Sequence, residues 1–180
     1  MIVELKNNKK VLLRQLAPAD IDAVAYYLQQ LSPASRSRFG PHEYNRDAMV
    51  YFYHPANNNT GYLAVDVESG GVVAYAIIKK GCLYDDGLRL QAYGLVLSEA
   101  GDCTFAPSVA DAWQSCGVGK SMYSFILAQL KTQGFTRVIL WAGVQATNSK
   151  AISFYNSVGF YRLGQFEHNG LNYDMVSDIW

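Results

Sequence analysis

Gln114-Ser115-Cys116-Gly117-Val118-Gly119-Lys120 is a glycine-containing stretch between a segment of strand character and a segment of helix character. Glycine permits a tight turn and lets a ligand approach the backbone closely. A helix that begins at such a turn presents unpaired N–H groups and the positive end of its dipole, which together suit an anionic phosphate. The stretch therefore predicts a phosphate-binding loop.

Three kinds of phosphate loop have glycines at comparable spacing. Gly119-Lys120-Ser121 ends like the Walker A pattern GxxxxGK[ST], but that pattern requires glycine where Gln114 stands. The dinucleotide pattern GxGxxG requires a third glycine where Met122 stands. The remaining pattern, [QR]xxGx[GA], is satisfied in full by Gln114, Gly117 and Gly119.

Hydrophobic periodicity and turn residues predict the elements around this loop. The expected strands are 11–15, 62–67, 72–79, 103–109, 138–142, 161–168 and 171–179. The expected helices run from 17 to the break at 31–33, in one or two short pieces between 36 and 53, from the glycine loop to Gly134, and from Asn148 to Gly159. Segment 81–97 is either an additional strand or a lid. This order predicts an α+β fold with a single central mixed, mostly antiparallel twisted sheet and helices on both faces.

Composition narrows the function classes. A chain of 180 residues has the size of one domain, so we expect residues 1–180 to form a single domain. Fifteen Lys and Arg balance fifteen Asp and Glu, and no basic run indicates a nucleic acid or a membrane surface as partner. Three cysteines without a CxxC pair, and only three histidines, predict no metal site. No apolar run reaches the ~20 residues of a membrane helix, and no signal peptide is recognisable, so we expect a cytoplasmic protein.

A second pattern accompanies the loop. It follows NxxAxxFYxxxGF and consists of Asn148, Ala151, Phe154, Tyr155, Gly159 and Phe160. With these two patterns, and with Pro107-Ser108-Val109-Ala110-Asp111 ahead of the loop, the chain resembles the GNAT superfamily of N-acetyltransferases over roughly residues 103–161. The resemblance implies the GNAT fold and the use of acetyl-CoA as acyl donor.

The resemblance also implies which residues hold acetyl-CoA. The pyrophosphate is expected on backbone N–H groups of Gln114, Ser115, Cys116, Gly117, Val118, Gly119 and Lys120. The Lys120 side chain either reaches a CoA phosphate or faces solvent. Pantetheine is expected to pair, as a strand would, with the backbone of Val109, Ala110 and Asp111. Family members usually have proline where Asp111 stands, and we expect its carboxylate to point away from the CoA phosphates.

Asn148 and Ala151 complete the expected cofactor contacts. Asn148 resembles the asparagine of the family that hydrogen-bonds pantetheine, although asparagine is also a good helix N-cap and both roles are compatible. Ala151 is small where the cofactor passes close to the helix.

Tyr155 is the residue that the resemblance marks for catalysis. When an amine attacks the thioester, the departing CoA thiolate needs a proton, and a phenol with a pKa near 10 stays protonated at neutral pH. The alternative for Tyr155 is a packing role. The general base is less clear: Glu99 is the favoured residue, while Asp102 and His168 are alternatives that could equally be turn or surface residues.

The sequence thus predicts an N-acetyltransferase that transfers acetyl from acetyl-CoA to a primary amine in a ternary complex. The acceptor is a small-molecule or peptide amine, and homodimer formation is compatible with the family. One alternative is a catalytically silent acyl-CoA-binding sensor or regulatory module. A nucleoside-triphosphate enzyme is a weaker alternative because Gln114 replaces the Walker A glycine.

Overall fold

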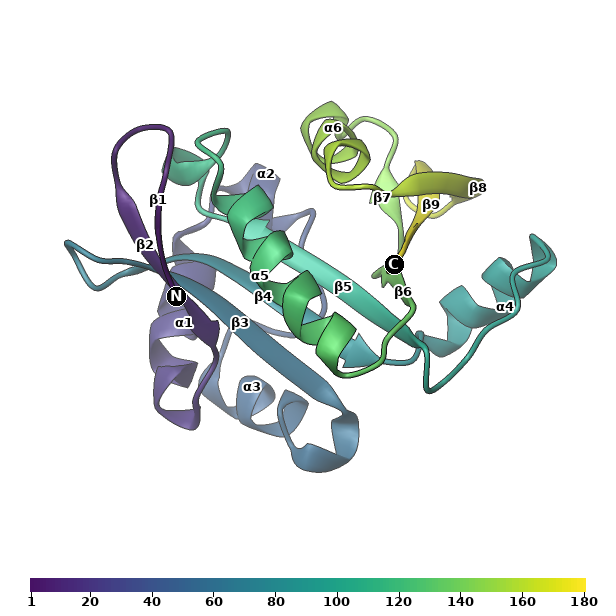
Figure 1. Ribbon diagram of the computed structural model, residues 1–180, viewed down its shortest axis with the longest axis horizontal. Helices are drawn as coiled ribbons and strands as arrows, with labels where there is room; N and C mark the ends of the chain where they lie inside the picture. The colour runs from purple at the N-terminus through teal and green to yellow at the C-terminus, as the bar shows by residue number, and fades with distance from the viewer. The chain divides into compact units, whose positions relative to one another are not determined.

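The computed structural model describes all residues, 1–180, and consists of nine strands, helices and short 3-10 turns (Figure 1). The strands are β1 Ile2–Glu4, β2 Lys10–Gln15, β3 Asn59–Asp66, β4 Val72–Lys80, β5 Asp102–Val109, β6 Arg137–Leu140, β7 Val144–Gln145, β8 Tyr161–Glu167 and β9 Leu171–Asp178. The helices are α1 Ile21–Gln30, α2 Pro33–Arg36, α3 Arg46–Phe52, α4 Tyr84–Ala92, α5 Val118–Thr132 and α6 Ser149–Ser157. Short 3-10 turns lie at η1 Pro18–Asp20, η2 Pro55–Asn57 and η3 Asp111–Trp113.

The chain forms two compact units, and β4, β5 and α5 contain residues of both. The first unit comprises Met1–Ile78 and Ala106–Ile126. The second comprises Lys79–Phe105 and Leu127–Trp180. The predicted fold class is confirmed: the sheet is mixed and mostly antiparallel, and helices connect its strands.

In the first unit the strand order is β1-β2-β3-β4-β5. β1 pairs antiparallel with β2, and β2 pairs antiparallel with β3. Adjacent residues of β3 show that helical segments cover both faces. A Cβ on Gly61 would lie 2.7 Å from the hydroxyl of Tyr53, which caps α3, whereas the Tyr62 ring packs against Phe125 of α5. Because side chains of a strand alternate between faces, α3 and α5 lie on opposite sides of this part of the sheet.

In the second unit the first half of β5 pairs parallel with β6, and β6 pairs antiparallel with β9. β9 also pairs antiparallel with β7 and with β8. The β8–β9 hairpin turns at Asn169-Gly170, both with positive φ, as the sequence predicts. Leu90 of α4, Ile139 of β6 and Val176 of β9 form a buried cluster in this unit.

Three elements differ from the expectation. Segment 84–92 is a helix, α4, and not an additional strand; a role of this segment as a lid stays a prediction. Its first turn carries Asp85 and Asp86, which suit a helix N-terminus, and Leu90 on its inner face is fully buried. β1 and β7, of three and two residues, were not expected because such short strands leave no periodic pattern in the sequence.

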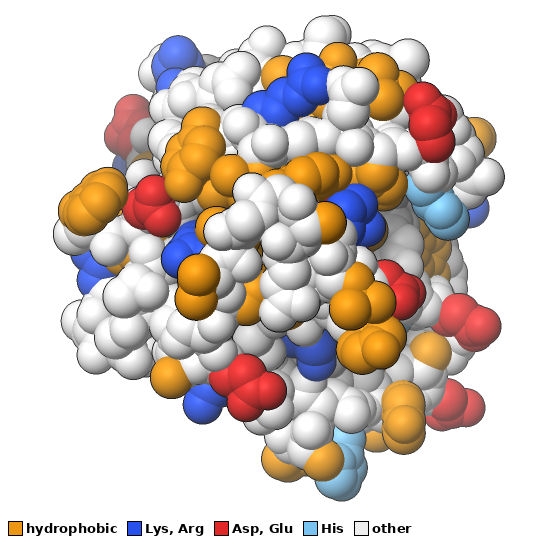
Figure 2. Space-filling model, turned by 90° about the vertical axis from the view of Figure 1, so that its right-hand side faces the viewer, with side chains coloured by type: hydrophobic (Ala, Val, Ile, Leu, Met, Phe, Trp, Pro, Cys, Tyr) orange, Lys and Arg blue, Asp and Glu red, His pale blue; other side chains and the backbone are white.

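The surface carries charges of both signs. On the face shown in Figure 2, Lys and Arg side chains lie interspersed with Asp and Glu. None of the helices combines the length and the apolar character that a membrane-spanning helix requires.

Candidate active site

β5 loses its partner on one side before it ends. β6 pairs only with Asp102–Phe105, the first half of the strand. Further along, the amide of Ala110 donates to the carbonyl of Val73 on β4, at 2.9 Å. Since successive residues of a strand direct their backbone groups to opposite sides, the N–H group of Val109, the last residue of β5, points away from β4. Asp111 lies beyond the strand, in the 3-10 turn η3. The end of β5 is therefore an open edge, on which an extended ligand can pair as an added strand.

The glycine loop follows this open edge directly. Ser115 and Gly117 both have positive φ, 64° and 103°. Only glycine adopts such a conformation without strain, which explains why the turn into α5 contains Gly117. Two bonds hold the loop in shape: the Gln114 side-chain amide donates to the Val109 carbonyl at 3.3 Å, and the Cys116 thiol donates to the Trp113 carbonyl at 2.8 Å.

The start of α5 offers several unpaired donors. The first intrahelical bond of the ladder runs from the amide of Ser121 to the carbonyl of Gly117, at 3.1 Å. The amides of Val118, Gly119 and Lys120 precede it and have no carbonyl one turn earlier in the helix. Together with the helix dipole, they form an arrangement suited to a phosphate group. The Lys120 side chain is exposed, so it can reach an anion from solvent.

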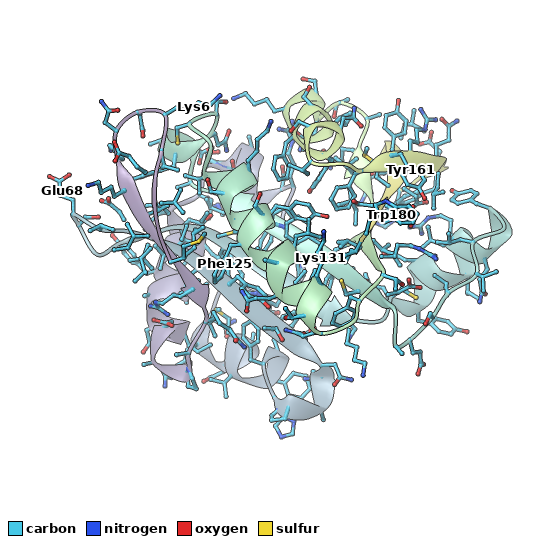
Figure 3. The ribbon with its side chains drawn as sticks, in the orientation of Figure 1. Lys6, Glu68, Phe125, Lys131, Tyr161 and Trp180 are labelled. Carbon is cyan, nitrogen blue, oxygen red and sulfur yellow. The ribbon has the colours of Figure 1, made fainter.

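The β1–β2 turn lies against this loop. The Lys6 amide donates to the Cys116 carbonyl at 3.4 Å, and the Lys9 ammonium lies 4.4 Å from the centre of the Trp113 ring. Figure 3 shows Lys6 at the tip of this turn, and Glu68 at the neighbouring β3–β4 turn. The contacts of Lys6 and Lys9 help to hold the glycine loop in place.

The Asp111 carboxylate points toward α2. It accepts hydrogen bonds from the Ser32 amide at 3.0 Å, the Ser32 hydroxyl at 2.9 Å and the Ser35 hydroxyl at 2.7 Å. These bonds, that of Ser35 foremost, lower the pKa of Asp111. The carboxylate is thus engaged with α2, in keeping with the expectation that it points away from the CoA phosphates.

In the second unit, Asn148 is the N-cap of α6. Its side-chain oxygen accepts a hydrogen bond from the Ala151 amide at 3.2 Å. The Nδ2 group of Asn148 makes no hydrogen bond within the protein, so a ligand contact remains open to it. Ala151, on the first turn, is partly exposed. The structure thus shows the capping role, and the cofactor contact of Asn148 stays a prediction.

Tyr155 is buried, with 8% of its surface exposed, on the inner face of α6. Its ring packs between Phe154 and Phe160, at centroid distances of 5.2 and 5.4 Å. The hydroxyl makes no hydrogen bond within the protein. Burial raises its pKa, so the group stays protonated and can serve as a proton donor at neutral pH. The ring therefore packs in the core, which was the alternative to a catalytic role, while the role of the hydroxyl as general acid stays a prediction.

The three residues considered as general base, Glu99, Asp102 and His168, lie in different surroundings. Glu99 is exposed in the turn before β5, at the opposite end of that strand from Val109. The role of Glu99 as general base stays a prediction. Asp102 is buried, and its carboxylate accepts a hydrogen bond from the Ser98 amide at 2.7 Å. The same carboxylate lies 3.7 Å from the Arg137 guanidinium, and these contacts give Asp102 a structural role. His168 is exposed beside the β8–β9 turn.

Comparisons with known proteins are consistent with this geometry. A family model described as the acetyltransferase (GNAT) family matches residues 26–160, three quarters of the chain. The chain belongs to the GNAT acetyltransferase family. No curated protein matches the GNAT chain in a sequence search.

Solved structures show the same fold at low identity. The GNAT domain of PAT from S. lividans is 19% identical and has a TM-score of 0.74, over 99% of this chain and 96% of that one. The ribosomal-protein-S5-alanine acetyltransferase from Vibrio fischeri is 12% identical, with a TM-score of 0.72 over 99% and 97%. AAC(6')-Ib, in complex with paromomycin and acetyl-CoA, is 17% identical, with a TM-score of 0.69 over 93% of each chain. At these identities the likeness concerns the fold alone.

The structure of this GNAT chain also brings together His42, Tyr53 and Tyr75, which no sequence pattern links. His42 Nε2 lies 2.9 Å from the Tyr75 hydroxyl, which also bonds to the hydroxyl of Tyr53. His42 Nδ1 lies 2.8 Å from the Glu43 carbonyl, which can only accept, so Nδ1 carries the proton and Nε2 accepts from Tyr75. Tyr75 was not among the expected site residues. Nothing in the sequence marks it, because its contacts are with residues more than twenty positions away.

The structure places no group of three or more His, Cys, Asp or Glu side chains where they could hold a metal ion.

Proposed function

We propose that the protein is an acetyl-CoA-dependent N-acetyltransferase that transfers the acetyl group to a primary amine by direct attack in a ternary complex. One observation carries the proposal: the open end of β5 is followed along the chain, after η3 and the glycine turn, by the unpaired amides of Val118, Gly119 and Lys120. A linear ligand with an amide-bearing arm and a pyrophosphate matches this order of groups. Acetyl-CoA has that composition, and the GNAT family uses it.

The residues supply three functions to the reaction. Backbone N–H groups of the open edge hold the arm of the donor and polarise its carbonyl. The amides at the start of α5 bind the pyrophosphate. The amine, once deprotonated, attacks the thioester carbon; the C–S bond breaks, and the Tyr155 hydroxyl gives its proton to the departing thiolate. The acetylated nitrogen loses a second proton as the amide forms. Of the two protons that the nitrogen gives up, one returns the tyrosinate to the phenol by way of solvent and the other is released to solvent.

The structural neighbours bear names that refer to different acceptors, a ribosomal-protein alanine in one and an aminoglycoside complex in another. We therefore propose only the class, a small-molecule or peptide amine. The three cysteines are free, which supports action in a reducing compartment such as the cytoplasm.

The test is an assay for thiol release from acetyl-CoA in the presence of an amine panel. The panel contains a polyamine, a free amino acid, an aminoglycoside and a peptide with an N-terminal alanine. Amine-dependent thiol release with formation of the acetylated amine is the expected result. CoA binding without turnover of any amine would favour the silent sensor module, and absence of CoA binding would refute both.

A further inference from the structure

Strand β6 is interrupted at the point where its pairing with β5 ends, and there the Trp141 amide donates to the Phe105 carbonyl at 3.0 Å. β6 and its continuation β7 both pair antiparallel with β9, but residues 140–143 face only residues 174 and 175 of β9. The surplus residues form a bulge, which bends a strand and ends its regular pairing. β7 consequently pairs with β9 and not with β5, and the end of β5 stays open.

Two consecutive residues of the bulge have a left-handed backbone, with φ of 52° at Ala142 and 67° at Gly143. Glycine adopts this conformation freely, whereas the Cβ of alanine makes it unfavourable, so a left-handed alanine persists only where other contacts hold it. Gly143 is closely surrounded: a Cβ there would lie 2.8 Å from both the Phe166 ring and the Tyr173 carbonyl. The side chain of Ala142 is exposed, so this residue is held through its backbone.

The bond that holds Ala142 comes from helix α4. The buried Asp86 carboxylate accepts a hydrogen bond from the Ala142 amide at 2.8 Å. Its other oxygen accepts from the Arg89 guanidinium at 2.8 Å, and Arg89 also donates to Asp174, the β9 residue opposite the bulge, at 2.6 Å. A carboxylate that is paired with arginine and accepts from a backbone amide forms a strong hydrogen bond. α4 therefore contacts the bulge on both strands.

The connection that contains α4 is longer than the sheet requires. The Gly81 amide donates to the Asp102 carbonyl at 2.8 Å and the Ala110 amide to the Val73 carbonyl at 2.9 Å, so β4 and β5 are antiparallel neighbours. A two-residue turn is enough to join such strands. Residues 81–101 join them instead, and they add a helix whose carboxylate reaches the bulge.

We propose that Asp86 is a positioning residue for the binding of acetyl-CoA: by holding the bulge at Ala142, it prevents β6 from pairing further along β5 and keeps the end of β5 open for the donor. The proposal rests on the proposed function, because it requires CoA on the open end of β5. Without the Asp86 bond, Ala142 changes to an extended conformation, which is sterically favourable for alanine. The stretch after β6 then competes with the arm of CoA for the backbone groups of β5.

The experiment measures the Kd for CoA by calorimetric titration of the full chain and its variants, and a urea unfolding curve shows that each variant is folded. Asp86→Ala is expected to raise the Kd roughly tenfold, the effect of losing one hydrogen bond to a charged group. Asp86→Asn keeps an oxygen that can accept from the Ala142 amide, so it should bind CoA nearly as the wild type does. Asp85→Ala removes the exposed neighbouring carboxylate of α4 and is the control, with an unchanged Kd.

Two substitutions of Ala142 separate the bulge from the ion pair of Asp86 with Arg89. Glycine takes a positive φ freely, so in Asp86→Ala/Ala142→Gly the bulge can form although the ion pair is missing, and the Kd should return toward the wild-type value. Ala142→Val leaves both charged residues in place, but its β-branched side chain disfavours a positive φ. We expect it to raise the Kd as Asp86→Ala does, and it decides the matter if Asp86→Ala does not fold.

The outcomes distinguish this proposal from the proposed function. A wild-type Kd in folded Asp86→Ala or in Ala142→Val would overturn the role of Asp86 and leave CoA binding intact. Binding by Asp86→Asn or by the double variant as weak as that of Asp86→Ala would assign the effect to the ion pair and overturn it as well. If the wild type does not bind CoA, the proposed function fails, and the role of Asp86 with it.

Discussion

Tyr155 combines a ring that is fixed by packing with a hydroxyl that has no partner in the protein. The Tyr155 hydroxyl is not among the side-chain atoms that are both fully buried and without a partner, so water or a ligand can reach it. A tyrosine used only for packing would be served equally well by phenylalanine, as at Phe154 and Phe160 beside it. The free hydroxyl therefore favours a chemical role.

Tyr155→Phe is expected to lower kcat by roughly 10²-fold or more, since the departing thiolate loses its proton donor. Stability should change little, because no hydrogen bond is lost. Because burial raises the pKa of Tyr155, wild-type kcat should not fall through ionisation of this group up to about pH 10. The measurement is kcat against pH for both proteins, with an amine found active in the panel. An unchanged kcat in Tyr155→Phe would remove the residue from the mechanism.

A substitution of Gly119 is expected to weaken the binding of CoA without lowering the stability of the protein. It lies in the first turn of α5, where alanine is the better helix former by about 1 kcal/mol. Gly119→Ala should therefore leave the melting temperature unchanged or raise it. The added methyl group would stand where the phosphate approaches the backbone, so we expect the Kd for CoA to rise roughly tenfold or more, which corresponds to about 1.4 kcal/mol. Calorimetric titration checks this, with Gly40→Ala, at a position with open space, as control.

At the scale of elements, an ion pair joins helix α4 to strand β9. Arg89 of α4 bonds to Asp86 on its own helix at 2.8 Å and to Asp174 of β9 at 2.6 Å, and its guanidinium lies 3.6 Å from the centre of the Phe166 ring. Both carboxylates are nearly inaccessible, with exposed fractions of 4% and 3%.

Arg89→Ala would leave these two buried carboxylates without their counter-charge. We expect a loss of about 2–3 kcal/mol in the free energy of unfolding, less than for a fully buried pair because Arg89 itself is partly exposed. Urea unfolding measures it. Arg46→Ala, which breaks the exposed pair with Asp22, is the control and should have almost no effect. Equal effects of the two substitutions would contradict this account of α4.

The bonds of His42 to Tyr75 and Glu43 predict a pH dependence of stability. Burial lowers the pKa of His42 below its ordinary 6.5, so between the two values the unfolded state binds more protons than the folded one. The contribution of His42 is thus present above about pH 6.5 and is lost as the pH falls. Urea unfolding at about pH 7.5 and about pH 5 should show this decline in the wild type, and a smaller one in His42→Gln, whose amide oxygen can accept from Tyr75 without titrating. An identical decline in both would assign it to other groups.

Local sequence signals predicted most elements of the fold and the glycine loop, because helix periodicity, turn residues and Gly117 act within a few positions. The sequence did not predict α4 because Tyr84 and Leu88 are exposed and Asp86 is buried, which obscures the apolar pattern that a helix normally shows. The hydrogen bonds of Asp111 to Ser32 and of His42 to Tyr75 could not be predicted, for another reason. They join residues 79 and 33 positions apart, and no local property of either partner specifies the other.

At the scale of the whole molecule, the GNAT fold says more about which acyl donor binds than about which amine accepts the acyl group. The loop and the open edge are made largely of backbone groups, which the fold itself supplies. The acceptor, by contrast, is not given by the fold, since proteins of this fold whose names refer to different acceptors are each less than 20% identical to this chain. Family membership therefore supports acetyl transfer and leaves the amine to experiment.

The central claim, that residues 109–120 form a CoA site, is tested most directly by thermal unfolding with acetyl-CoA, CoA or ATP. A ligand at 100 times its Kd stabilises the folded state by about 2.7 kcal/mol, which raises the melting temperature of a domain of this size by several degrees. We predict such a rise with acetyl-CoA and with CoA, and none with ATP. No rise with either CoA species, or a rise with ATP alone, would contradict the account.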